Sequence, residues 1–349
     1  MILLTGGTGY IGSHTAVKLI EQNKDIIILD NLYNSKAEVI DSIETITGKR
    51  PKFYQTDLLD IDGLEQIFKE NKVDCVIHFA GLKAVGESVE KPLLYFNNNI
   101  TGTINLLMTM QKYNCKKIIF SSSATVYGTT QVMPLTENSP LGVTNPYGRT
   151  KLVIEEMLND LHASDKEFGI VLLRYFNPIG AHKSGLIGES PNGIPNNLMP
   201  YICKVAKCEL PQLNVFGNDY DTVDGTGVRD YIHVEDLAVG HALAYDKIKS
   251  TNGIYTYNLG TGNGYSVLQV IRAFEKANDI KINHKIAPRR AGDVATVYAS
   301  TKKAEEEIGF KAQYGIEEMC RDSWNFAKIA FQPTKSLTQN NHQEQKSLI

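Results

Sequence analysis

A tyrosine and a lysine four residues apart form the pair in this sequence best suited to proton transfer. They are Tyr147 and Lys151, and they stand where a helical pattern begins after Pro146. On a helix this spacing puts both side chains on one face, so the ammonium can lie near the phenol. A free tyrosine has a pKa of about 10, and poising it near neutrality takes about 4 kcal/mol, which nearby cations can supply. Tyr147 is therefore the candidate general base.

A serine at the end of an apolar segment is the third candidate for chemistry. Ser123 closes the run Ser121-Ser122-Ser123, which follows the apolar residues 118–120. Its hydroxyl can hydrogen-bond a reacting oxygen and steer the proton of that oxygen to Tyr147. A lone tyrosine–lysine pair of this spacing also occurs on solvated helix faces, where it does no chemistry. The order of the motifs along the chain favours the catalytic interpretation.

Three glycines precede this group and predict a dinucleotide site. Gly6, Gly9 and Gly12 follow the first apolar segment, 2–4, and open a helical pattern. Gly6 suits a tight turn, Gly9 lets the backbone approach a pyrophosphate, and Gly12 permits close packing of the helix. The amides at the helix N-terminus attract the same anion.

An aspartate about 20 residues further on strengthens this interpretation. Asp30 ends the second apolar segment, 26–29, where its carboxylate can bind an adenosine ribose and repel a 2′-phosphate. We therefore expect NAD rather than NADP, and its cationic nicotinamide would help Lys151 to favour the phenolate. The alternative is that the glycines merely end a strand and that Asp30 caps a helix. Weaker signals at later strand ends, Asp57-Leu58 and Phe79-Ala80-Gly81, suit the adenine and the pyrophosphate.

The elements that must position these residues alternate between apolar and amphipathic segments. Buried strands are expected near residues 2–4, 26–29, 75–79, 118–120 and 170–173, with helices between most of them. This alternation predicts an α/β fold with a doubly wound, parallel-sheet Rossmann domain, whose ligands bind beyond the carboxyl ends of the strands. Prolines and glycines after residue 177 indicate a smaller C-terminal α/β lobe.

The predicted domain boundaries follow from the same pattern. We expect an NAD-binding domain over residues 1–176, with its sheet completed by segments near 230–236 and 255–259. A mainly substrate-binding lobe would cover 177–331. Residues 332–349 are rich in Gln, Asn, Ser and Lys without any period, which predicts a disordered tail.

Composition excludes several other classes of protein. The chain has 349 residues, 42% of them hydrophobic, and a net charge of -3, so no basic stripe invites nucleic acid or an anionic membrane. No signal peptide or membrane span is expected. The five cysteines are scattered and unpaired in pattern, which indicates a reducing, cytoplasmic setting: Cys75, Cys115, Cys203, Cys208 and Cys320. His78 and His233 lack metal-ligand spacing, so we predict no metal site.

With these residues in view, the sequence resembles the UDP-galactose/UDP-glucose 4-epimerase family of extended short-chain dehydrogenases/reductases, over all but its last residues. The motifs that carry the resemblance are those at residues 6–14, 30–35, 78–88, 174–178, 194–200 and 224–233. The resemblance implies a cofactor site of Gly6, Gly9, Tyr10, Ile11, Gly12, Asp30, Asn31, Leu32, Tyr33, Asn34, Ser35, Asp57, Leu58, Phe79, Ala80, Gly81, Leu82, Lys83, Asn98, Ser123, Tyr147, Lys151 and Phe176. It also implies UDP-sugar contacts from Ser123, Tyr147, Asn177, Asn197, Leu198, Asn214, Val215, Phe216, Arg229, Arg290, Asp293 and Val297.

The activity that the resemblance implies is interconversion of UDP-galactose and UDP-glucose in galactose metabolism. The sugar would pass through a 4-keto form, with its hydride held for a time by bound NAD. Val297 matches the position beside the sugar C2 substituent, and its small size predicts that UDP-N-acetylglucosamine and UDP-N-acetylgalactosamine also enter. The resemblance further implies a homodimer, formed by the helix after Pro92 and the helix that begins near Tyr147.

Two other functions stay open from the sequence. A sugar-nucleotide 4,6-dehydratase would share the cofactor site but needs an acid and a base after the strand-end serine, where this chain has Ala124 and Thr125. A non-catalytic NAD-sensing protein on the same fold is the second alternative. Retention of Ser123, Tyr147 and Lys151 together argues against it.

Overall fold

The molecule is built around a seven-stranded, fully parallel sheet. The computed structural model describes residues 1–129, 132–290 and 292–330. The strands lie in the order β10-β6-β5-β4-β1-β2-β3, with the bounds β1 (Ile2–Thr5), β2 (Ile26–Asp30), β3 (Lys52–Gln55), β4 (Cys75–His78), β5 (Lys117–Ser123), β6 (Gly169–Tyr175) and β10 (Gly253–Leu259). The strand order reverses between β1 and β4, because the chain adds β2 and β3 on one side of β1 and the later strands on the other. Open α/β sheets bind their ligands at such a switch point. The predicted fold class is confirmed.

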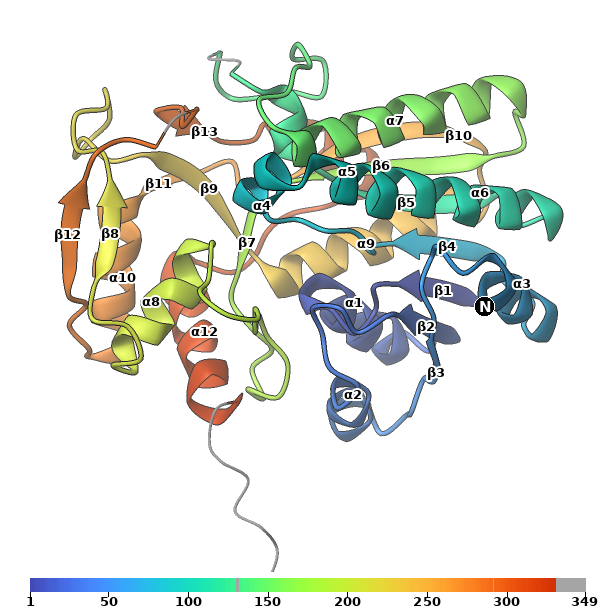
Figure 1. Cartoon of the computed structure of the whole chain (residues 1–349), viewed down its shortest axis with the longest axis horizontal. Helices are drawn as coiled ribbons and strands as arrows, with labels where there is room; N and C mark the ends of the chain where they lie inside the picture. The colour runs from blue at the N-terminus through green and yellow to red at the C-terminus, as the bar shows by residue number, and fades with distance from the viewer. Residues whose placement is uncertain (130–131, 291, 331–349) are drawn as a thin grey trace, which may run out of the picture.

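Helices cover both faces of this sheet because successive residues of each buried strand point to opposite sides. Leu4, Ile28 and Ile77 pack into one core with α1 (Tyr10–Glu21), α2 (Val39–Thr47) and α9 (Val234–Ile248). Their neighbours Leu3, Ile27 and Val76 pack into the other core with α3 (Ile61–Glu70), α6 (Gly102–Lys112) and α7 (Pro146–Ser164). Figure 1 shows α6 and α7 along one side of the sheet and α1 on the other.

Shorter helices line the connections. The segment between β4 and α6 forms α4 (Val85–Glu90), α5 (Pro92–Tyr95) and a π-helix, η1 (Phe96–Thr101). A 3₁₀-helix, η2 (Ala124–Tyr127), follows β5, and α11 (Lys302–Ile308) packs beside β10.

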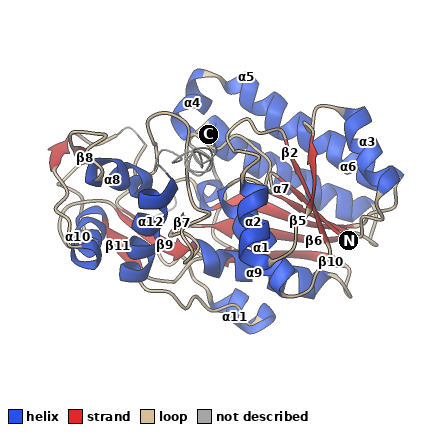
Figure 2. Cartoon of the chain, turned by 90° about the horizontal axis from the view of Figure 1, so that it is seen from below, coloured by secondary structure: helices blue, strands red, loops and turns tan. Residues whose placement is uncertain are grey.

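The smaller lobe has its own core. A four-stranded sheet contains β11 (Gly264–Ser266), β9 (Val228–His233) and β13 (Thr296–Val297), with β7 (Asn177–Ile179) also paired to β9. A second sheet pairs β12 (His284–Ala287) with β8 (Leu213–Phe216). Three helices pack on these strands, namely α8 (Leu198–Ala206), α10 (Val267–Asn278) and α12 (Ile316–Ala330), and Figure 2 shows this lobe at one end of the molecule.

Two features of the fold differ from the sequence-based expectation. The segment near 230–236 does not complete the large sheet, because its strand β9 pairs with β7, β11 and β13, and its following residues open α9. The segment near 255–259 does join that sheet, as part of β10 beside β6. The strand β3 was not expected, because its residues 52–55 are half-exposed and form no continuous apolar run.

Other predicted segments are placed as follows. β6 ends at Tyr175 and β7 begins at Asn177, while α9 and β10 return to the first domain. The predicted tail, 332–349, lies outside the described residues. Within the described part of the chain, no helix is both long and apolar enough to cross a membrane.

Candidate active site

The glycine motif forms a tight loop between β1 and α1. Gly6 has a φ of 70°, and a Cβ there would lie 2.7 Å from the backbone nitrogen of Ala80. A Cβ on Gly12 would lie 2.4 Å from the Gly6 carbonyl oxygen. Gly9 is the N-cap of α1, and no side chain at this position accepts a hydrogen bond from the first amides of the helix. Such a loop fits the pyrophosphate of a dinucleotide.

Asp30 ties this loop to the one that follows β2. Its carboxylate accepts hydrogen bonds from the Thr8 amide (3.1 Å), the Leu32 amide (2.9 Å) and Ser35 Oγ (2.9 Å). Thr8 Oγ1 also donates to Ser35 Oγ at 2.8 Å. Asp30 is 7% exposed. These contacts therefore fix the position of the buried carboxylate at the end of β2.

The remaining predicted cofactor residues gather along the same edge of the sheet. Asn31 Nδ2 donates to Asp57 Oδ2 at 2.7 Å, which joins the loops after β2 and β3. Leu58 is buried, whereas Tyr33 is exposed. Asn34 Oδ1 accepts from the amide of Asn192 in the smaller lobe at 3.4 Å.

The loop after β4 continues this edge. The amides of Phe79 and Ala80 both donate to the Thr5 carbonyl at 3.0 Å, which places the loop against the end of β1. Gly81, Leu82 and Lys83 follow. Tyr10 and Ile11 open α1 beside it.

Tyr147 lies in the first turn of α7, opposite the end of β5. The Asn145 side chain caps this helix by accepting from the Gly148 amide at 2.8 Å. Burial raises the pKa of Tyr147, while a hydrogen bond with Ser123 and the charge of Lys83 lower it. Ser123 also accepts from the Thr125 amide at 3.3 Å. The predicted serine and tyrosine are thus brought together.

Lys151 has a different partner from the one that the sequence predicted. Its ammonium donates to the Ser121 carbonyl (2.6 Å) and to Ser121 Oγ (3.3 Å), and it lies 4.7 Å from the centre of the Phe120 ring. The charge that lowers the pKa of Tyr147 is that of Lys83, on the loop after β4. Burial lowers the pKa of Lys151 to about 7, against the opposing charge of Glu155.

A second cluster of predicted residues lies in the smaller lobe. Arg290 Nε donates to Asp293 Oδ2 at 3.2 Å, and Arg229 Nη2 lies 3.9 Å from Asp293 Oδ1. The Arg290 guanidinium lies 4.6 Å from the centre of the Phe216 ring. Two guanidinium groups beside one carboxylate suit a diphosphate together with hydroxyls. Asn214 Oδ1, on the same strand as Phe216, is buried without a protein partner, as expected of a ligand contact.

Glu189, which the sequence analysis did not identify, connects the two clusters. Its Oε1 accepts from Lys83 Nζ at 2.8 Å and from Asn197 Nδ2 at 2.7 Å. A predicted cofactor residue and a predicted substrate residue therefore share one carboxylate. Its loop is rich in glycine and proline and offers no sequence pattern that singles Glu189 out.

Asn99 is a second residue that was missed. It accepts from the Leu82 amide at 2.8 Å and donates to the Leu82 carbonyl (3.0 Å) and to Thr150 Oγ1 (3.0 Å). It thus fixes the loop after β4 to the turn of α7 between Tyr147 and Lys151. Its place in the π-helix η1, a distortion common at functional sites, is the structural signal. The predicted Asn98 is its neighbour and donates to it at 2.9 Å.

The remaining predicted residues lie at the junction between the lobes. Phe176 and Val297 pack in one small apolar cluster with Val126 and Ala299. Val297 is also the β-sheet partner of Arg229. Asn177 opens β7, and Leu198 opens α8 and packs on the core of the smaller lobe.

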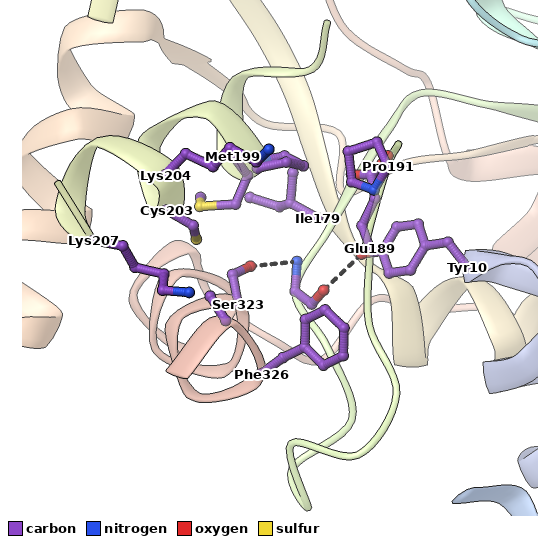
Figure 3. A pocket seen from close by; sticks show the side chains of 13 residues that line it. Tyr10, Ile179, Glu189, Pro191, Met199, Cys203, Lys204, Lys207, Ser323 and Phe326 are labelled. Atoms are coloured by element: carbon purple, nitrogen blue, oxygen red, sulfur yellow. Dashed lines mark hydrogen bonds between the residues drawn. The ribbon is translucent and has the colours of Figure 1, made fainter. Parts of the chain in front are cut away.

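A small cavity lies beside this junction, between α8, α12 and the loop that carries Glu189 (Figure 3). Tyr10 lines it, and its hydroxyl donates to the Gly180 carbonyl at 2.7 Å, while the Gly180 amide donates to Ser323 Oγ at 3.0 Å. The space open to water is about 30 Å³. That volume is far below the several hundred Å³ of a typical ligand site. The cavity is therefore too small to hold a nucleotide by itself.

The two histidines considered above have structural partners. His78 contacts Thr5 Oγ1 (2.7 Å) and Thr103 Oγ1 (2.9 Å), and burial lowers its pKa to about 3. His233 caps α9 and lies 3.2 Å from Asp322 Oδ2. In the described ranges, no three His, Cys, Asp or Glu side chains come together as a metal site.

Comparisons with known proteins agree on one family. The model of the family described as GDP-mannose 4,6 dehydratase matches residues 3–323. A UDP-glucose 4-epimerase of Bacillus subtilis is 58% identical over 325 residues, which are 93% of this chain and 96% of the relative.

Solved structures give the same result. The UDP-glucose 4-epimerase of Bifidobacterium longum, in complex with NAD+ and UDP, is 54% identical with a TM-score of 0.91, covering 94% of this chain and 98% of the other. The UDP-Glc/GlcNAc 4-epimerase of Campylobacter jejuni is 36% identical with a TM-score of 0.83, covering 94% and 98%. This chain therefore belongs to the UDP-glucose 4-epimerase family of extended short-chain dehydrogenases/reductases.

Proposed function

We propose that this protein is an NAD-dependent UDP-glucose 4-epimerase that interconverts UDP-galactose and UDP-glucose. The observation that carries the proposal is the placement of Tyr147, which hydrogen-bonds Ser123 and feels the charge of Lys83 at the edge of a dinucleotide-binding sheet. Relatives with this name are more than half identical over nearly the whole chain.

The residues present fit NAD. The glycine loop leaves the N-terminal amides of α1 open to a pyrophosphate, and the Asp30 carboxylate suits the adenosine ribose. Asp57 and Leu58 would border the adenine, while Lys151 and Phe176 would lie on the nicotinamide side. When bound, NAD supplies the acceptor for the hydride on C4 and returns it.

The residues of the chain control the proton. Tyr147 Oη would take the proton of the sugar 4-hydroxyl and give it back after inversion, with Ser123 holding the reacting oxygen. The charge of Lys83 opposes the effect of burial on the ionisation of the phenol. Lys151 would add its positive charge on the nicotinamide side. Ionisation of the phenol would depend on these charges.

Inversion requires the sugar to present both faces while its nucleotide stays fixed. Arg229 and Arg290 would hold the diphosphate, and Asp293 the ribose hydroxyls. The sugar can then turn about its diphosphate link without leaving the site. No net oxidation results, because the hydride returns to the carbon from which it came.

The two rival functions are less well supported. A 4,6-dehydratase needs an acid and a base where η2 begins, but Ala124 and Thr125 occupy those positions. A sensor has no use for a buried tyrosine that is hydrogen-bonded to a serine and influenced by the charge of a lysine.

The proposed substrate range includes N-acetylated sugars. Val297 packs beside Phe176 and pairs with Arg229, so it belongs to the junction where the sugar would lie. A valine leaves space that a larger aromatic side chain would fill. The relative from Campylobacter jejuni is named for both UDP-Glc and GlcNAc, which supports this proposal.

We also propose a homodimer in the cytoplasm. Leu93, Ile104 and Met108 expose large apolar side chains on α5 and α6, and Leu93 is 79% exposed. Such a face, next to α7, suits an isologous helix–helix interface. The cysteines in the described part of the chain are free, which fits a reducing compartment.

The test is direct. Purified protein should retain NAD and convert UDP-galactose to UDP-glucose without added cofactor, as measured by product analysis. Retained NAD without conversion would favour the sensor, and release of a 4-keto-6-deoxy sugar would favour the dehydratase.

A further inference from the structure

A buried ion pair lies directly behind the candidate catalytic residues. Glu155 on α7 and Arg174 on β6 are 2% and 4% exposed. Arg174 Nε donates to Glu155 Oε1 (3.0 Å) and Nη2 donates to Oε2 (2.7 Å), so the guanidinium binds both carboxylate oxygens. Ser122 Oγ donates to the same carboxylate at 2.5 Å. The acceptor sites of Glu155 are thus used by two neighbouring strands, β5 and β6.

The guanidinium continues the network away from α7. Arg174 Nη1 donates to Tyr127 Oη (3.0 Å) and to the Glu137 carbonyl (3.1 Å). Tyr127 in turn donates to Asn258 Oδ1 on β10 at 2.6 Å. The ion pair therefore connects α7 to η2 and to the far edge of the large sheet.

Stability alone does not account for charges at this place. An apolar pair of similar volume stabilises a core as well as a buried ion pair does, because burying two charges costs several kcal/mol of desolvation. What distinguishes Glu155 is its position, one helical turn after Lys151 and two after Tyr147 on one face of α7. Its partner Ser122 adjoins Ser123 on β5.

The charge of Glu155 also acts on Lys151. Burial lowers the pKa of Lys151 to about 7, and the Glu155 carboxylate opposes that decrease. Besides the Arg174 guanidinium, which is paired with Glu155, the other titratable groups around this ammonium are neutral at pH 7. They are His78 on β4, whose pKa burial lowers to about 3, and Tyr175 on β6 and Tyr147 on α7, whose pKa values burial raises. Glu155 is thus the carboxylate placed to keep Lys151 protonated.

We propose that Glu155, clamped by Arg174 and Ser122, is a positioning residue for the epimerase reaction: it fixes the face of α7 that carries Tyr147 against the end of β5 and keeps the Lys151 ammonium charged. This inference rests on the proposed function. Glu155 itself touches no substrate.

The test compares the pH dependence of kcat for UDP-galactose in the holoenzyme and its variants. Glu155→Gln removes the charge and keeps the shape, so the alkaline limit of kcat should move to lower pH by about one unit, the size expected of one charge about one helical turn away. KM should change little. Glu155→Asp keeps the charge on a shorter side chain. The alkaline limit of kcat should therefore lie at the wild-type pH, while kcat itself stays reduced.

Arg174→Met should shift the alkaline limit of kcat in the opposite direction. It removes the positive charge and leaves the carboxylate to act on Lys151, so the alkaline limit should move to higher pH. If Arg174→Met does not fold, Arg174→Lys replaces it and should keep the wild-type limit. Tyr127→Phe is the matched control, since it removes the hydrogen bonds of its hydroxyl with Arg174 and Asn258 and no charge. A downward shift in the arginine variants, or an unshifted limit in Glu155→Gln, would overturn the proposal.

A second measurement works without turnover. The ¹³C shift of Lys151 Cε, in lysine-labelled protein and assigned by its loss in Lys151→Met, reports the titration of this ammonium directly. The midpoint should fall in Glu155→Gln and not in Tyr127→Phe. If the wild-type protein fails to convert UDP-galactose, the proposed function is wrong, whereas this titration still decides the role of Glu155.

Discussion

The surroundings of Tyr147 have opposing effects on its pKa. Burial, the largest effect, raises its pKa, and only the hydrogen bond from Ser123 and the charge of Lys83 act in the other direction. A phenol in this position is a poor base until more positive charge is present beside it. The cationic nicotinamide of NAD supplies that charge in the proposed function, so cofactor and base depend on each other.

Removal of the hydroxyl tests this assignment. Tyr147→Phe should fold and retain NAD, because the ring keeps its packing area, but turnover should fall by about 100-fold to 10,000-fold, the usual contribution of a general base. Steady-state kinetics with UDP-galactose measures the loss. Wild-type turnover in the variant would show that another group is the base.

Asp30 should decide between the two dinucleotides. At an effective dielectric constant of about 20, two charges about 4 Å apart repel by about 4 kcal/mol, so its carboxylate should exclude a 2′-phosphate. Asp30→Asn keeps the shape of the side chain and an acceptor oxygen. The Kd for NADP divided by the Kd for NAD should therefore fall by about tenfold or more. Asp62→Asn, on the exposed face of α3, is the control. Equal affinities in the wild-type protein would contradict the prediction.

Val297 should set the size of the sugar that enters. Val297→Tyr would fill the space beside the C2 substituent, so we expect it to keep the hexose reaction and to lose the reaction of the N-acetylated sugars by steric exclusion. Val297→Ala should retain both reactions. Product analysis with UDP-galactose and UDP-N-acetylgalactosamine decides. The prediction is wrong if the wild-type protein converts UDP-galactose but not UDP-N-acetylgalactosamine.

At the scale of elements, the candidate site lies where the carboxyl ends of the parallel strands, the start of α1 and the π-helix η1 come together. The strand ends and the start of α1 could be predicted from sequence, since apolar runs and glycine spacing are local patterns. The π-helix could not, because the extra residue in its turn is stabilised by the contacts of Asn99 with Leu82 and Thr150, on separate elements.

The exposed face of α5 and α6 leads to a prediction about assembly. The double variant Leu93→Glu with Met108→Glu places two charges in the proposed interface, so the protein should become monomeric without loss of its fold. Light scattering after gel filtration, with thermal unfolding, measures both. Val223→Glu is the control, since Val223 is 76% exposed on the smaller lobe. A monomeric wild-type protein would remove the basis of the prediction.

At the scale of the molecule, buried histidines couple stability to pH. Burial lowers the pKa of His14 and His78 to about 3 and that of His241 to about 4, while it raises the pKa of Glu235 to about 7. Below their unfolded pKa of about 6.5, the histidines bind protons in the unfolded state and not in the folded one, so stability is lost as the pH falls. Glu235 acts in the opposite sense between about pH 4.5 and 7.

The three histidines and Glu235 together give an expected slope of about two protons. His182, whose pKa burial also lowers, acts in the same sense as the other histidines. Between about pH 6.5 and 4.5, the free energy of unfolding should fall by about 3 kcal/mol per pH unit, since each proton contributes about 1.4 kcal/mol. Urea unfolding at several pH values measures this slope. His78→Gln should reduce it by about one proton, whereas His284→Gln, on an exposed ring, should leave it unchanged. A slope that does not respond to His78→Gln would disprove the assignment.

The sequence by itself determined the fold class, the strands at the centre of the large sheet and the dinucleotide loop. These follow from local sequence patterns. A buried parallel strand must be apolar, and a turn whose backbone approaches a pyrophosphate needs glycines at fixed spacing. It also predicted Ser123, Tyr147 and Lys151 as the candidate catalytic group, and these residues lie within one α/β unit.

Only the tertiary structure decided which charges meet. Lys83, rather than Lys151, acts on the phenol, Glu189 joins the two lobes, and β9 pairs outside the large sheet. Arg174 and Glu155 are 19 residues apart in the chain, and their contact depends on the packing of α7 against β6. Such pairings are set by how elements pack in three dimensions, and a carboxylate or a guanidinium in a single sequence carries no sign of the partner that it will face.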